Sequence, residues 1–131
     1  MITASVHDRD HLGRSALHCA VEFDADPEVI ELLVENGCDL EEPMPDGRTI
    51  LEVACSNGVE CVSTLIRLGV DVNQRNSLGE TPLHRCAGSA RTNVARALLA
   101  GGADRTLKTP DGLAAVDLAR NIYMRSVLRL E

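Results

Sequence analysis

Histidine and cysteine lie close to one another at two places in this sequence of 131 residues. His18 directly precedes Cys19 in SALHCA, and His84 lies two residues before Cys86 in ETPLHRCA. An imidazole beside a thiol is typical of cysteine catalysis, and the same two residue types are common zinc ligands. These two pairs are therefore the first candidates for a catalytic or metal site.

The spacing of these residues argues against both kinds of site. Neighbouring side chains on a helix diverge by about 100°, so His18 and Cys19 would point away from one another. The sequence has no C-x-x-C, and the only histidines outside the expected helices are His7 and His11. It also contains no glycine-rich phosphate loop, nucleophile elbow or H-E-x-x-H. We therefore predict that the protein is not an enzyme and has no catalytic residues, metal or cofactor.

The composition is that of one folded domain, residues 1–131, without membrane spans. Hydrophobic residues make up 44% of the chain and aromatic residues only 2%, which favours closely stacked small helices over a β-sandwich. No apolar run approaches the roughly 18 residues of a membrane span, and the N-terminus lacks the apolar core of a secretory signal. Five cysteines, an odd number, make a disulfide framework the weaker interpretation. We expect a cytoplasmic protein with reduced thiols, with the nucleus as the alternative.

The net charge of −7 is distributed unevenly along the chain. Residues 1–66 carry fourteen acidic residues against three arginines, a net charge of −11, whereas residues 67–131 carry +4. Such asymmetry steers partners or favours weak head-to-tail self-contact, although solvated faces also drift in sign. The basic half lacks the aromatic platform typical of nucleic-acid binding, so no nucleic-acid partner is expected.

A repeat of about 33 residues sets the elements that position these side chains. Four glycines recur at spacings of 34, 32 and 33 residues, and an apolar anchor follows each one four residues later. Each unit holds two helical patterns, as in TPLHRCAG and NVARALLAGG, and glycine after a helix favours its termination. A polar, turn-rich loop then leads to the next unit. The recurring glycines are Gly13, Gly47, Gly79 and Gly112.

GETPLHRCA followed by NVARALLAGGAD resembles the ankyrin repeat, whose signature is T-P-L-H-x-A with a period of 33 residues. The resemblance implies an all-α solenoid of stacked helix-turn-helix units with hairpin-like loops. It implies four repeats at about residues 8–42, 43–75, 76–106 and 107–131, the last a truncated cap. The first has one extra residue between its helices and the second has one fewer, while Asp117 replaces the histidine in the fourth.

The same resemblance gives the histidines and cysteines structural roles. His18 and His84 are expected to lie between stacked units and to bond to loop backbone, because a buried polar ring needs such partners. Cys86 falls on a small-residue position of the packed seam. Cys19 and Cys55, on first helices, are expected to be partly exposed.

The family's fold also implies a function, which is to bind a protein partner through the concave surface of loop fingers and first helices. We expect a monomer whose partner the sequence does not identify. Narrower alternatives are a small regulator resembling inhibitors of cyclin-dependent kinases or myotrophin, or the targeting domain of a larger protein. The different-class alternative is an enzyme or nucleic-acid binder. The family's contact positions, transferred residue by residue, are His11, Leu12, Arg14, Glu22, Phe23, Pro45, Asp46, Arg48, Ser56, Asn57, Ser77, Leu78, Glu80, Arg85, Ser89, Pro110, Asp111, Leu113 and Asn121.

Phe23 and Leu78 are the expected anchors, because exposed aromatic and aliphatic groups carry a large share of binding energy. Met44, Leu107 and Leu113 would either add apolar character to the finger tips or pack within the loops.

Arg75, Arg85 and Arg105 would form a basic face for an acidic partner segment. Arg85 is the most distinctive, since it replaces an apolar residue of a first helix. We expect Arg85→Glu to weaken binding and to leave thermal unfolding nearly unchanged.

One further motif concerns Asn73. LIRLGVDVN, residues 65–73, resembles the sequence that oxygen-sensing asparaginyl hydroxylases modify in ankyrin domains of animal cells. Asn73 would be the acceptor, and a gain of one oxygen in intact mass would test this. The alternative is that Asp71 and Asn73 support the turn by hydrogen bonds.

Overall fold

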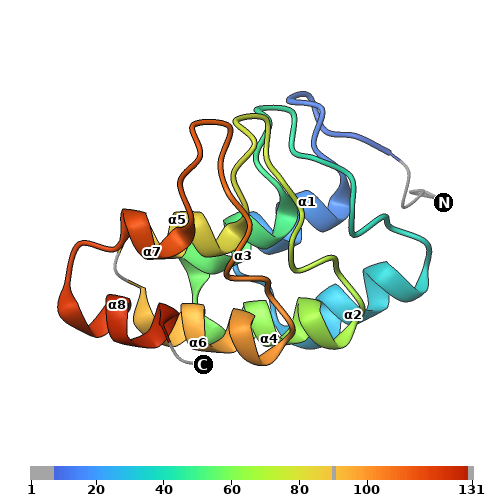
Figure 1. Ribbon diagram of the computed structural model, residues 1–131. Coiled ribbons are helices and arrows are strands. Elements are labelled where there is room, and N and C mark those ends of the chain that lie inside the picture. The colour runs from blue at the N-terminus through green and yellow to red at the C-terminus, as the bar shows by residue number, and fades with distance from the viewer. Residues whose placement is uncertain (1–7, 90, 130–131) are drawn as a thin grey trace, which may run out of the picture.

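The computed structural model describes residues 8–89 and 91–129, and within them eight helices form four pairs (Figure 1). The helices are α1 (Ala16–Glu22), α2 (Pro27–Glu35), α3 (Ile50–Asn57), α4 (Val59–Arg67), α5 (Pro82–Gly88), α6 (Thr92–Ala100), α7 (Ala115–Leu118) and α8 (Ile122–Leu128). The only bridges in this part of the chain are isolated ones, Arg9 with Ser15 and Lys108 with Ala114. The all-α solenoid expected from the sequence is confirmed.

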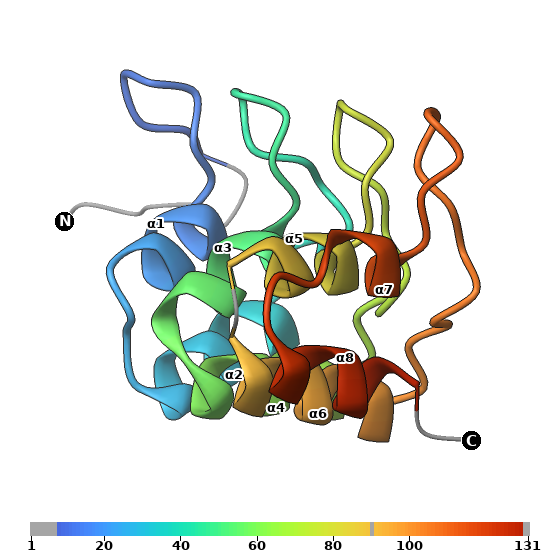
Figure 2. The same ribbon diagram turned by 60° about the vertical axis from the view of Figure 1, so that its left-hand side comes forward.

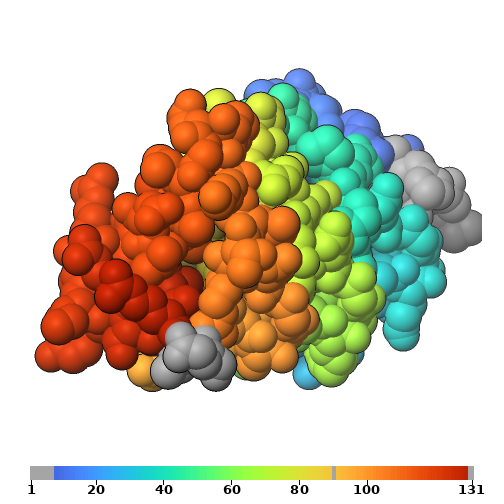
Figure 3. Space-filling model, in the orientation of Figure 1, coloured from blue at the N-terminus to red at the C-terminus, as the bar shows by residue number. Residues whose placement is uncertain are grey.

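The pairs stack side by side in two layers. The first helices α1, α3, α5 and α7 form one layer and the second helices α2, α4, α6 and α8 form the other, with the loops projecting from the first layer (Figures 1 and 2). We call each pair with its preceding loop a unit. The units follow one another as bands across the molecule, from the first unit at one end to the fourth at the other (Figure 3).

The projecting loops are narrow fingers, residues 10–14, 44–48, 76–80 and 109–113. In each, the first residue's N–H donates to the carbonyl of the last at 2.8–3.0 Å. The fourth residue of each finger is glycine in the left-handed region, with φ between 78° and 92°. At Gly47 space is also limiting, because a Cβ there would lie 2.3 Å from Ser77 Oγ of the next finger. The fingers are therefore packed against one another.

Hydroxyl groups begin the first three first-layer helices. Ser15, Thr49 and Thr81 accept from the backbone N–H three residues later, which satisfies a donor that the helix cannot. In the fourth unit the cap position is Ala114, which has no hydroxyl. There Asp117 Oδ2 accepts from the Ala114 N–H at 2.9 Å instead.

The turns between paired helices differ in length as the sequence does. In the first unit α1 and α2 are joined through Asp24, which adopts a left-handed φ of 54°. In the second unit Gly58 both ends α3 and precedes α4, so one residue makes the whole turn.

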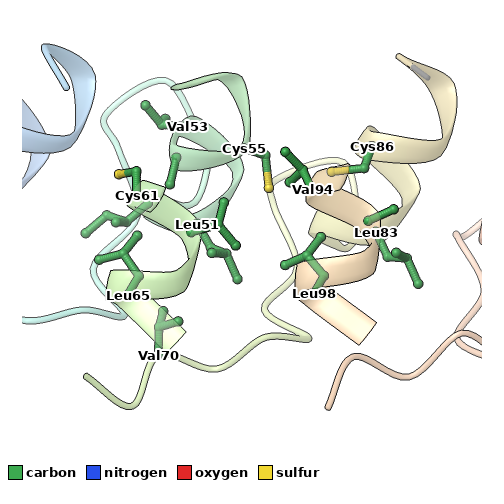
Figure 4. Close-up of a cluster of buried hydrophobic side chains, with 14 of the residues drawn as sticks. Leu51, Val53, Cys55, Cys61, Leu65, Val70, Leu83, Cys86, Val94 and Leu98 are labelled. Atoms are coloured by element: carbon green, nitrogen blue, oxygen red, sulfur yellow. The ribbon is translucent and has the colours of Figure 1, made fainter. Parts of the chain in front are cut away.

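Aliphatic side chains and cysteines fill the space between the layers (Figure 4). Cys55, Cys61 and Cys86 lie in this core with Leu51 and Leu83. Cys19 is half-buried as expected, but Cys55 is only 3% exposed, so the expectation of a partly exposed thiol there was wrong. The reason is register, because Cys55 occupies the position of Val21 in α1 and Ala87 in α5, which are 1% and 0% exposed. Met44 is also buried, so it packs within its loop and adds nothing to the finger tip.

Among the helices that the structure describes, none combines the length and apolar character needed to cross a bilayer.

Candidate functional site

His18 and His84 tie the first and third units to the loops that follow them. His18 Nδ1 accepts from the Ser15 N–H at 3.0 Å, and Nε2 lies 2.9 Å from the Glu42 carbonyl. Since a carbonyl only accepts, Nε2 carries the proton. His84 accepts from the Thr81 N–H in the same way, and its Nε2 donates to the carbonyls of residues 107 and 113 at 3.0 and 3.1 Å. The expected inter-unit role is confirmed for Nε2, while Nδ1 holds the ring against the start of its own helix.

The thiols are not prepared for nucleophilic attack. Contact with the Cys86 thiol, together with burial, raises the pKa of Cys55. Burial raises the pKa of Cys61 to about 11, and burial and the Asp10 carboxylate raise that of Cys19. Thiol catalysis needs the opposite shift. None of the five cysteines forms a disulfide, and within residues 8–89 and 91–129 no three His, Cys, Asp or Glu side chains converge as metal ligands.

Two hollows that share one lining residue lie on the finger side of the stack instead. The first, of about 230 Å³, lies between the first two fingers, and the second, of about 260 Å³, lies between α3 and α5. Arg48 lines both hollows and joins them. We call this surface the concave groove. The first hollow is lined by Leu12, Arg14, Glu22, Met44, Pro45, Asp46 and Arg48, and the second by Arg48, Glu52, Cys55, Ser56, Arg85, Cys86, Ser89 and Arg91.

A chain of alternating charges runs along the first hollow. Asp10 pairs with Arg14 at 2.9 Å, Arg14 with Glu22 at 3.7 Å, Glu22 with Arg48 at 3.4 Å, and Arg48 with Asp46 at 2.9 Å. The backbone N–H of Arg14, with its guanidinium, lowers the pKa of Asp10 to about 2. These contacts join the first finger, α1 and the second finger.

An aromatic ring lies at the edge of that chain. The Arg14 guanidinium stands over the Phe23 ring, 5.5 Å from its centroid. The ring is nevertheless 71% exposed. Arg14 therefore holds a large apolar surface in place without covering it.

The second hollow is built around Glu52, which replaces the histidine of the first and third units. Its side chain is buried, and a carboxylate only accepts, so it needs donors where His18 and His84 find carbonyls. Asn76 Nδ2 of the next finger donates at 3.1 Å, and Arg85 Nε of α5 at 3.0 Å. Arg85 also pairs with Glu80 at 3.4 Å.

This arrangement corrects the interpretation of Arg85. Its side chain is exposed, as expected, but it is the counter-ion of a buried carboxylate rather than a charge free to meet a partner. Arg85→Glu would place a third carboxylate beside Glu52 and Glu80, so the structure predicts a loss of stability where the sequence predicted nearly unchanged unfolding. The unusual Arg85 accompanies the unusual Glu52.

The other two expected members of a basic face also have structural contacts. Arg75 Nη1 donates to the carbonyls of Gly79 and Lys108, which ties the third finger to the segment leading into the fourth. Arg105 Nη1 donates to the Leu128 carbonyl at the end of α8. Binding of an acidic segment by Arg75, Arg85 and Arg105 stays a prediction.

The contact positions inferred from the sequence are distributed unevenly over this geometry, and all of them are exposed or half-buried. Nine line the groove: Leu12, Arg14, Glu22, Pro45, Asp46, Arg48, Ser56, Arg85 and Ser89. The others lie outside the two hollows; Asn121 caps α8 and lines a separate hollow at the end of the stack, about 620 Å³ in volume. Sequence reasoning missed Glu52 and Arg91 as lining residues. Glu52 and Arg85 are 33 residues apart, so opposite charges one repeat apart were the available signal.

Asn73 holds the turn between units. Its Oδ1 accepts from the Asp104 N–H at 2.8 Å, and its own N–H donates to Asp71 Oδ1 at 2.9 Å. The turn-supporting interpretation is confirmed. Hydroxylation of Asn73 stays a prediction.

Known proteins share both the pattern and the fold. The family profile described as "Ankyrin repeats (3 copies)" matches residues 17–111. Ankyrin repeat and SOCS box protein 11 from Danio rerio is 33% identical over 127 residues, 96% of this chain and 43% of that protein. Protein phosphatase 1 regulatory subunit 27 from Homo sapiens is 39% identical over 84 residues, 63% of this chain and 54% of that protein. This chain thus spans about half the length of these relatives.

A solved structure agrees with them. The ankyrin repeat domain of Bcl-3, a member of the IkappaB protein family, superimposes with a TM-score of 0.89 at 30% identity, over 97% of this chain and 56% of that one. Repeat period, inter-unit histidines, paired helices and profile all point to one conclusion. The chain belongs to the ankyrin repeat family.

Proposed function

We propose that the protein binds a segment of a protein partner in the concave groove and performs no chemistry of its own. Ankyrin repeats are protein–protein interaction modules in general. The observation that carries the proposal for this surface is the exposure of large apolar side chains on the groove-side elements. Phe23 is 71% exposed and Leu78 67%, while Leu12 lines the first hollow.

The groove is ordered before any partner arrives. The histidine ties and the ion pairs from Asp10 to Asp46 hold the fingers and first helices in place. A rigid surface loses little conformational freedom on binding, so more of the contact energy is expressed as affinity. The charged side chains of the groove already form ion pairs with one another. A partner that displaces water from them therefore meets only a modest desolvation cost.

The two hollows favour different side chains of the partner. The first is lined by the apolar Leu12 and Pro45, two carboxylates and two guanidinium groups. The Asp10 carboxylate pairs with one of these guanidinium groups, so the hollow suits an apolar side chain beside a cation. In the second, Arg91 forms no ion pair with any side chain of the described residues, and the hydroxyls of Ser56 and Ser89 lie nearby. That hollow suits a carbonyl or carboxylate. We propose an extended segment that carries an apolar residue and a cation at one end and an acceptor at the other.

Affinity capture from the cells that express the protein tests this, with a matched pair of aromatic substitutions. Phe23→Ala removes the ring beside the groove, and Tyr123→Ala removes an equally exposed ring, 75%, on α8. We expect Phe23→Ala to lose most of the captured partner and Tyr123→Ala to retain it. Equal capture by both variants, or selective loss with Tyr123→Ala, would contradict the proposal.

The narrower predictions, a kinase-inhibitor-like or myotrophin-like regulator or a targeting domain of a larger protein, remain predictions. The name of the relative Protein phosphatase 1 regulatory subunit 27 describes a regulatory role for that protein. The mass-spectrometric identity of the partner captured with wild-type protein, and absent with Phe23→Ala, would decide among them.

A further inference from the structure

The two ends of the stack expose surfaces that the inner units bury. Counted from the glycine after each second helix, Val29 corresponds to Cys61 and Leu32 to Thr64. Val29 is 44% exposed where Cys61 is 5%, and Leu32 is 58% exposed where Thr64 is 4%. Within the described residues the second unit has a neighbour before it and the first has none, so we assign these two positions to packing against a preceding unit.

Ile30 supports this assignment of direction. It is fully buried, as is Val62 at the same position of the second unit. Burial at this position is therefore independent of a preceding unit, unlike burial at the positions of Val29 and Leu32. Single exposed apolar residues are common on protein surfaces. Val29 and Leu32 differ from these because they lie together where the next unit has its stacking surface.

At the opposite end of the stack, the exposed face is the one that would pack against a following unit. The helix α8 buries Met124, Val127 and Leu128 against the unit before it. Its other face, Ile122, Arg125, Ser126 and Arg129, follows the spacing of one helical stripe and is exposed. Together with Arg120 and Asn121 it lines the end hollow of about 620 Å³. This is where a following unit would lie.

The charges of the two end surfaces are opposite. On α2, Glu28 and Glu35 share the exposed face with Val29 and Leu32. On the α8 side three arginines surround Ile122, and none of Arg120, Arg125 and Arg129 forms an ion pair within the described residues. Glu35 also occupies the position at which Arg67 of the second unit pairs with Glu31 of the first. With a carboxylate at this position, an equivalent ion pair needs a cation on the preceding helix, and α8 carries such cations.

We propose that the α2 face of one molecule (Glu28, Val29, Leu32 and Glu35) stacks on the α8 face of a second copy (Arg120, Ile122, Arg125 and Arg129). The solenoid then continues head to tail across molecules, with the aliphatic groups packed at the centre and the charges paired around them. The arginine stems cover the apolar surface while their charged ends remain in water. The two faces differ, so the contact is heterologous and the assembly remains open rather than closing as a two-fold dimer.

Such a contact is weak and depends on salt. It joins one helix pair to another, which is smaller than a standard stable interface, and its charges are exposed to screening. The expected monomer is therefore the state at low concentration. Reversible growth of the mean mass with concentration is expected at low ionic strength.

Sedimentation and light scattering over a concentration series test the proposal with two charge-reversed variants. Glu28→Arg/Glu35→Arg makes both end faces basic, and Arg120→Glu/Arg129→Glu makes both acidic. The structure shows no hydrogen bond or ion pair for these four side chains within the described residues, so thermal unfolding should change little. The matched controls are Glu60→Arg on α4 and Arg96→Glu on α6. Both side chains are exposed, and both belong to the middle units rather than to the ends of the stack.

We expect wild type and the controls to gain mass continuously with concentration at about 20 mM salt and to lose it at about 300 mM. Each end variant alone should remain monomeric, and mixing the two end variants should restore growth, because each basic end then meets an acidic one. A wild type that stays monomeric throughout, a mass that stops at a dimer, or association that survives in the end variants would each overturn the proposal. None of these outcomes depends on the groove or its partner.

Discussion

The first and second junctions between units are each bridged by hydrogen bonds of one buried polar side chain, but this side chain is a donor in the first junction and an acceptor in the second. At the first, His18 is a neutral donor that reaches the backbone carbonyl of Glu42. At the second, Glu52 is an acceptor that is only 8% exposed, and it draws in Asn76 from the next finger and Arg85 from the next helix. The hydrogen bonds of His18 stay within the two units, whereas Glu52 and its partner Arg85 also line the concave groove. The residue at this one position thus affects the charge pattern of the concave groove.

The largest effect is expected where a histidine junction is broken. His84→Ala leaves the Thr81 N–H and the carbonyls of residues 107 and 113 without their ring partners and opens a cavity. Together these effects should lower the free energy of unfolding by about 3 kcal/mol. Urea denaturation measures this, with the exposed His11→Ala as a control that should change little. Equal stability of the two variants would show that the ring does not hold the junction.

Crowding of the fingers at the second junction gives the next largest effect. Gly47→Ala places a side chain at a left-handed φ of 92° and against Ser77, which should cost about 1–3 kcal/mol. Gly88→Ala in α5, where a Cβ meets nothing within 4 Å, should be neutral or slightly stabilising. Thermal melts of the two alanine variants give the comparison, and matching melting temperatures would contradict it.

The glutamate junction should show energetic coupling that the histidine junction lacks. Arg85→Ala leaves Glu52 with Asn76 alone, so stability should fall by about 1.5 kcal/mol. In a Glu52→Gln background the same substitution should cost clearly less, because no buried charge remains. A double-mutant cycle from denaturation curves reports the difference. Additive effects would mean that Arg85 is a surface residue, as the sequence first suggested.

The smallest effect concerns pH at the first finger. Asp10 has its pKa lowered from 3.8 to about 2 in the folded state, so its contribution is present above pH 4 and is lost as pH falls toward 2. Asp10→Asn should therefore melt below wild type at pH 6, and the two should converge near pH 2. Asp26→Asn, whose side chain makes no cap hydrogen bond, is the control. A gap in melting temperature that stays constant over this range would contradict the assignment.

The sequence predicted the fold well because the repeat is a local and periodic signal. Glycine spacing, the cap positions and the place of His18 and His84 follow from residue type alone. The contacts of Arg75, Arg85 and Arg105 did not, because long side chains choose among several distant partners. Lys108 lies 33 residues from Arg75, and Leu128 lies 23 from Arg105. Burial of Cys55, in contrast, could have been predicted from the repeat, because Cys55 shares its register with the apolar Val21 and Ala87, which are also buried.

Hydrogen exchange of the backbone amides, with and without a partner captured by the wild-type protein, tests the central claim most directly. Partner binding in the concave groove should slow exchange in the first two fingers, residues 10–14 and 44–48, and in α3 and α5. The second helices α4 and α6 should exchange as in the free protein. Protection confined to α4 and α6, with unchanged fingers, would show that the partner binds the opposite layer and that the groove is not the binding surface.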